Sequence, residues 1–172
     1  MVSHPKAGLF VFLGLLWILA SCTPNSPDHG ELFQTVLQLP KGGAFRGVSL
    51  GMPLDSVRKM ELPLVPVHDD EFGLAYELAI GDGREMNLEY LTRTPERPVV
   101  ASIVCNLWLR DMAETSGLYG ELENHWGSRY GVADGPVGKV TWKDATEDIW
   151  LSLSILEDKK SISFNFVPLG GF

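Results

Sequence analysis

The chain has 172 residues, of which 22 are acidic and 14 are basic, and its formal net charge at neutral pH is −8. All the acidic residues lie beyond residue 21, where 13 basic residues leave a net charge of −9. This excess of negative charge argues against a nucleic-acid partner, because phosphate binding requires clustered Lys and Arg side chains. The length is sufficient for one domain with its own hydrophobic core.

The first 21 residues have the organisation of a secretory signal peptide. Lys6 precedes fourteen uncharged and mostly apolar residues, 7–20, fewer than the roughly 20 that a membrane-spanning helix needs. The stretch that follows, Leu19-Ala20-Ser21-Cys22, resembles the lipobox of bacterial lipoproteins. The resemblance implies cleavage before Cys22, a diacylglyceryl group on its sulfur, and a further acyl chain such as palmitate on the new amino terminus.

The same resemblance implies a location. In Gram-negative lipoproteins an Asp after the cysteine signals retention in the inner membrane, and Thr23 stands at that position here. We therefore expect a lipid-anchored envelope protein on the outer membrane, facing the periplasm. A Gram-positive cell surface is the alternative location, and an ordinary signal peptide or an uncleaved anchor is the alternative to lipidation.

In chain order, we expect an acylated Cys22 with a polar tether over 22–31 and a single domain over 32–172. Residues 32–40 fit a strand or a short helix. Leu54, Val57 and Met60 recur on one helical face after Pro53, which predicts a helix over 53–61. Two alternating runs, 72–80 and 84–91, flank a glycine turn and predict a hairpin. An apolar strand over 99–109 follows.

A second helix is predicted over 112–130. Asp111 and Glu114 have the spacing of a capping box, apolar residues recur every four positions, and Gly131 suits the end of the helix. Three further strands are expected over 138–143, 148–156 and 161–167. The predicted fold is α+β, an antiparallel sheet with helices on one face, in an order compatible with two α-β-β-β halves.

Residues 48–57, Val-Ser-Leu-Gly-Met-Pro-Leu-Asp-Ser-Val, resemble the opening of small helix-then-sheet lipoprotein modules, the SmpA/OmlA group and the related β-lactamase-inhibitor-protein-like domains. These modules scaffold or bind proteins and are not enzymes, so the resemblance implies a non-catalytic role. The chain departs from the pattern at Glu61-Leu-Pro, where the family usually has a glycine that ends the helix.

Few residues suggest chemistry. His68-Asp-Asp-Glu71 has ligand-type side chains, but neighbours in a strand point to alternate sides, so an exposed loop is the simpler interpretation. Glu121 and His125, one helical turn apart, fit a solvated helix face better than a metal site. Cys105 fits a buried core position, so no disulfide with Cys22 is expected. We predict no catalytic residues, no metal and no cofactor. The least favoured alternative is an enzyme that uses His68 or His125.

Three tryptophans, Trp108, Trp142 and Trp150, fall on predicted strands. Trp108 and Trp150 are out of phase with their apolar neighbours, so they face the open side of the sheet if those neighbours face the helices. Together the three are candidates for a binding surface, and a register error of one residue would reverse this assignment. The predicted function is binding or scaffolding of another envelope protein. The alternative is a small ligand bound in a pocket between sheet and helices.

Overall fold

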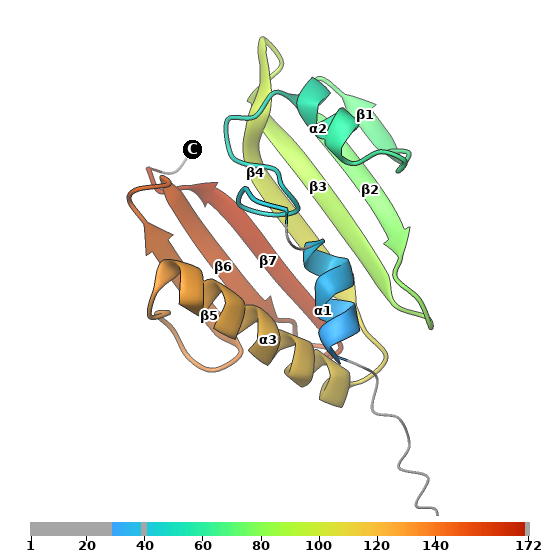
Figure 1. Cartoon of the computed structure of the whole chain (residues 1–172), viewed down its shortest axis with the longest axis vertical. Helices are drawn as coiled ribbons and strands as arrows, with labels where there is room; N and C mark the ends of the chain where they lie inside the picture. Colours follow the sequence, from blue (N-terminus) through green and yellow to red (C-terminus); the bar gives the residue numbers. More distant parts are fainter. Residues whose placement is uncertain (1–28, 39–40, 171–172) are drawn as a thin grey trace, which may run out of the picture.

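The computed structural model describes residues 29–38 and 41–170. In this part, three helices lie on one face of a seven-stranded antiparallel sheet (Figure 1), which confirms the predicted fold class. The helices are α1 (His29–Leu37), α2 (Leu54–Met60) and α3 (Met112–Tyr130). The strands are β1 (His68–Asp70), β2 (Gly73–Ala79), β3 (Glu85–Thr94), β4 (Arg97–Trp108), β5 (Lys139–Asp144), β6 (Ile149–Ile155) and β7 (Ser161–Pro168).

The order of strands across the sheet is β1-β2-β3-β4-β7-β6-β5. The strands that follow α2 therefore form one half of the sheet and those that follow α3 form the other, and the halves meet where β4 pairs with β7. Each of the six strands predicted from alternation is present. The first half has one strand more than the second, because β1 pairs with β2 at the sheet edge.

The long helix α3 begins and ends where the sequence predicts. Asp111 caps it by accepting a hydrogen bond from the Glu114 backbone amide at 2.9 Å. Gly131 ends it with a φ of 87°, a conformation that favours glycine. Its buried stripe includes Trp126, whose ring centroid lies 5.0 Å from that of Phe164 on β7. The apolar stripe thus sets which face of α3 meets the sheet.

The hydrophobic core lies between the sheet and the helices. Its central row crosses four strands through the register pairs Leu88, Cys105, Phe164 and Leu153, all with fully buried side chains. Cys105 is a free thiol, as expected for an inert core position, and burial raises its pKa. Because side chains alternate along a strand, this row places the intervening residues of the same strands on the other face of the sheet.

Two elements differ from the sequence-based expectation. Residues 29–31 belong to α1, so the predicted boundary between tether and domain at residue 31 is wrong, and the helical alternative for 32–40 is the correct one. Leu32 and Val36, one helical turn apart, are buried and hold α1 on the core. The run 68–70, predicted as a loop, is the short edge strand β1. Residues 1–28, including the signal peptide and Cys22, lie outside the described residues.

No helix in the described ranges has the length and apolar character needed to cross a membrane.

A buried ion pair connects the N-terminal segment to the sheet. The Arg46 guanidinium donates to the Glu61 carboxylate at 2.8 Å, and each side chain is 1% exposed. The Tyr90 hydroxyl on β3 donates to the same carboxylate, and Arg46 also donates to the Val36 carbonyl of α1 at 3.4 Å. These contacts compensate the cost of removing both charges from water, and they fix α1 and the end of α2 against β3.

A second buried carboxylate links the β2–β3 hairpin to α3. Arg84, at the start of β3, donates to Glu114 at 2.8 Å, and Arg110 donates to it at 3.0 Å through both its side chain and its backbone amide. Burial on its own would raise the pKa of Glu114. The hydrogen bonds from Arg84 and Arg110 outweigh that effect, and the pKa lies at about 2.

Glu114 should therefore contribute to acid sensitivity. Its folded-state pKa lies below the ordinary value of 4.5, so its stabilisation is complete above that value and is lost as the pH falls towards 2. We expect Glu114→Gln to lower the free energy of unfolding at pH 7. Below pH 5 the free energy of unfolding of the variant should fall less steeply with pH than that of the wild type, by the contribution of about one proton. Urea denaturation at several pH values measures this, with the exposed Glu157→Gln as control. Parallel stability curves for wild type and Glu114→Gln would contradict it.

Candidate functional site

The sheet face turned away from the helices is here called the open face. Its centre carries rows of small polar side chains, here called the polar floor. One row crosses four strands through the register pairs Asn87, Asn106, Ser163 and Ser154. The neighbouring row contains Asn165, Ser152 and Thr141. All of these residues are half-buried by their neighbours on the sheet. The described helices all lie on the opposite face (Figure 1), so none of them covers this polar floor.

Two tryptophans stand on the open face. Trp108 at the end of β4 is 42% exposed and Trp150 on β6 is 41% exposed. Each alternates with buried residues of its own strand, Leu107 and Leu151 among them. The predicted outward orientation of Trp108 and Trp150 is therefore confirmed.

Trp142 does not share that surface, and its inclusion in the predicted surface is wrong. It is 2% exposed and lies on the helix side, where its ring centroid is 6.1 Å from that of Trp126. Its indole nitrogen donates to the Gly131 carbonyl at 3.1 Å. The cause is strand phase, because Trp142 pairs with the buried Leu151 and so belongs to the core set of β5.

Each exposed tryptophan has a charged cross-strand partner, and the two partners have opposite sign. Trp108 pairs with Glu85 on β3, and Trp150 pairs with Lys143 on β5. Glu77 and Glu89 add negative charge on β2 and β3, whereas Lys139 adds positive charge on β5. The open face is therefore bipolar, with an acidic side across β2 and β3 and a basic edge at β5.

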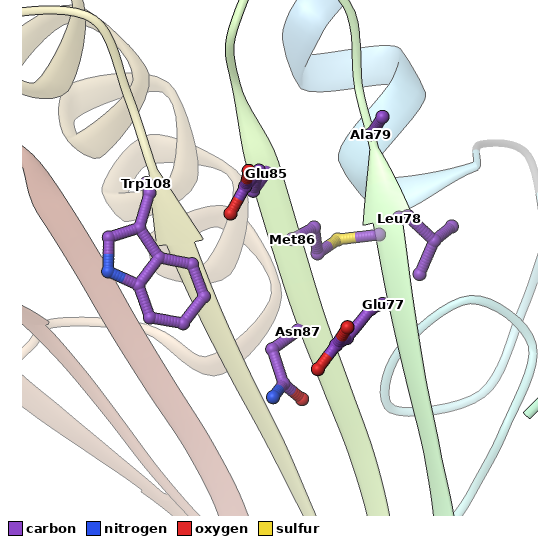
Figure 2. Close-up of a pocket in the computed structure, with 7 residues that line it drawn as sticks. All are labelled: Glu77, Leu78, Ala79, Glu85, Met86, Asn87 and Trp108. Carbon is purple, nitrogen blue, oxygen red and sulfur yellow. The ribbon is translucent and has the colours of Figure 1, made fainter. Parts of the chain in front are cut away.

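A depression of about 420 Å³ lies at the acidic side, beside Trp108 (Figure 2). Its lining comes from three neighbouring strands. Figure 2 shows Glu77 and Asn87 next to each other on β2 and β3, with Glu85 and Trp108 beyond them. The lining residues are Glu77, Leu78, Ala79, Glu85, Met86, Asn87 and Trp108.

Two amide oxygens of the polar floor are without partners. The Oδ1 atoms of Asn87 and Asn165 are shielded from solvent and accept no hydrogen bond within the described chain. Shielded polar atoms are normally satisfied, because an unmet acceptor costs free energy.

The charged residues around His68 already interact with one another. Arg58 donates to Asp69 from its Nε atom, which lies 3.1 Å from Oδ1 and 3.0 Å from Oδ2 of the carboxylate. His68 Nε2 lies 2.8 Å from Asp70 Oδ2, and Asp70 also accepts from the Phe72 amide. Within residues 29–38 and 41–170, no group of three or more His, Cys, Asp or Glu side chains is placed to hold a metal ion.

His125 lies at a helix contact, so its predicted place on a solvated helix face is wrong. The reason is α1, which covers this part of α3 and brings Phe33 to a ring-centroid distance of 5.6 Å, edge to face. Burial, followed by the nearby charge of Arg129, lowers the pKa of His125. The imidazole therefore serves the packing of α1 on α3.

Comparisons with protein-family models, with curated proteins and with solved structures give no match to this chain. The resemblances at Cys22 and at residues 48–57 therefore stay predictions.

The three strand tryptophans differ in burial, so their replacement by alanine should differ in its effect on the free energy of unfolding. We expect Trp142→Ala to lower the free energy of unfolding by about 3–5 kcal/mol, because it empties a core position. Trp108→Ala and Trp150→Ala should each cost less than about 1 kcal/mol, because their indoles are already partly in water. Chemical denaturation of the three variants measures this. Equal losses at all three positions would contradict the assignment of faces.

Proposed function

We propose that this protein is a lipid-anchored, non-catalytic component of the cell envelope that binds another envelope protein through the open face of its sheet. The observation that carries the proposal is the exposure of Trp108 and Trp150 on the face that no described helix covers. Tryptophan is enriched among the residues that dominate protein–protein binding energy. The half-buried polar floor between them suits the hydrogen-bonded, hydrated part of such an interface.

The anchor in this proposal is Cys22, on the resemblance to a lipobox. Two acyl chains give stable membrane attachment where one is marginal. The seven residues from Cys22 to the start of α1 at His29 span at most roughly 25 Å. An anchored domain would therefore stay close to the membrane surface, where it meets membrane-bound partners. With Thr23 after the cysteine, we place it on the outer membrane, facing the periplasm.

A protein partner is favoured over a small ligand held between sheet and helices. Under α3 that interior is filled, because Trp126 contacts Trp142, Phe164 and Phe166 in edge-to-face geometry. The depression beside Trp108 lies on the open face instead, where it adjoins the polar floor. A broad, shallow and polar surface flanked by two indoles suits a protein better than an enclosed small molecule.

Lipidation is tested by metabolic labelling. We expect a chain expressed in its bacterial host to incorporate labelled palmitate and to sediment with membranes. Cys22→Ala should lose the label and accumulate in the unprocessed form, because the acceptor thiol is gone. Retention of the label in Cys22→Ala would contradict the anchor.

Partner binding is tested by site-specific photo-crosslinking in intact cells. A benzophenone amino acid at Ser163, on the open face, should give one dominant adduct. The same probe at Ser128, exposed on α3, is the matched control and should give none. We expect Trp108→Ala and Trp150→Ala to reduce the Ser163 adduct several-fold without loss of folded protein. Adducts from Ser128 alone would overturn the assignment of the open face.

A further inference from the structure

We propose that the depression beside Trp108 binds a cationic side chain, Lys or Arg, presented by the protein partner. This inference rests on the proposed function and specifies the chemistry of one part of the interface. It stands on three features of the described chain: an exposed indole, carboxylates without counter-ions, and the opposite charge beside the other exposed tryptophan.

The exposed indole supplies the first part of the subsite. Trp108 ends β4 with 42% of its surface in solvent, and it borders a depression large enough for a long side chain. Tryptophan is the aromatic residue that attracts cations most strongly, because its ring face carries negative potential. A Lys or Arg side chain also has an apolar stem that can pack along such a ring.

The carboxylates supply the second part. Neither Glu77 nor Glu85 forms an ion pair within residues 29–38 and 41–170. Other glutamates of the chain are paired: Glu61 with Arg46, Glu114 with Arg84, and Glu147 with Arg129. The depression therefore has negative charge that no described group of the chain neutralises, and a cation from outside would do so.

The strand register brings these groups together. Glu85 is the direct cross-strand neighbour of Trp108, and Glu77 is that of Asn87, whose shielded Oδ1 atom lacks a donor. Figure 2 shows the four side chains around the same depression. An indole face and two carboxylates are the complement of a guanidinium or an ammonium, both of which carry several donors and one positive charge.

The other end of the open face sets the polarity of the contact. Trp150 has Lys143 as its cross-strand neighbour, with Lys139 on the same edge strand. A cation would be repelled there and attracted at Trp108. The matched surface on the partner therefore carries a basic residue opposite β2–β3 and an acidic one opposite β5, which selects one orientation of docking.

The experiment follows the indole N–H signals of the whole chain, ¹⁵N-labelled and held in a neutral detergent, by NMR. The probes are two tripeptides, acetyl-Gly-Lys-Gly-amide and acetyl-Gly-Glu-Gly-amide, added to millimolar concentration. We expect the lysine peptide to shift the Trp108 signal and the glutamate peptide to leave it in place. The Trp150 signal, beside Lys143, is the internal control and should not respond to the lysine peptide.

The variant Glu77→Gln/Glu85→Gln should weaken the lysine-peptide response at Trp108 by about fivefold or more. The matched control is Glu123→Gln/Glu157→Gln, which changes net charge equally outside the depression and should respond like wild type. Equal responses to both peptides, or no response, overturn the cationic subsite. So does an unchanged response in Glu77→Gln/Glu85→Gln.

The Ser163 photo-adduct separates this inference from the proposed function. If the adduct forms and its yield falls in Glu77→Gln/Glu85→Gln but not in the control pair, the cationic subsite is supported in the native complex. If the adduct forms with equal yield in all these variants, protein binding stands and the cationic subsite is wrong. If the lysine peptide binds but Ser163 gives no adduct, the protein-binding function is wrong and so is the inference that the cation belongs to a protein partner.

Discussion

The antiparallel pairing of β4 with β7 is the interaction on which the rest of the structure depends. It joins the strands that follow α2 to those that follow α3, and its register aligns Cys105 with Phe164 in one buried row. A shift of one residue would turn every core side chain of one half towards solvent. The same register leaves Trp108 and Trp150 on the open face, so the candidate binding surface is a direct consequence of how the core is closed.

The charged groups on the two faces of the sheet differ in how they are paired. On the helix side, Arg46–Glu61 and Arg84–Glu114 are neutralised inside the fold, where they fix α1 and α3 relative to β3. Loss of one partner there would leave a buried charge uncompensated. On the open face, Glu77 and Glu85 remain in contact with solvent without a cation from the described chain. Internal pairing stabilises the fold, while the open-face charges are available to a partner.

The proposed anchor and the proposed interface are compatible. The open face is bipolar, with Glu85 beside Trp108 and Lys143 beside Trp150, and a bipolar face favours one docking orientation over its reverse. A short connection from Cys22 to His29 would hold that face near the membrane. Attachment raises the local concentration of the domain relative to membrane partners, so modest affinity at each tryptophan would suffice.

The sequence by itself determined the α+β class, the six alternating strands, the limits of α3 and the outward phase of Trp108 and Trp150. These follow from local periodicity and from capping residues such as Asp111, which act within a few positions along the chain. The tertiary structure alone decided that α1 covers His125, and that Arg46 meets Glu61 and Arg84 meets Glu114. The Arg46–Glu61 and Arg84–Glu114 contacts join residues 15 and 30 positions apart along the chain. They depend on how the helices pack on the sheet, which no local pattern encodes.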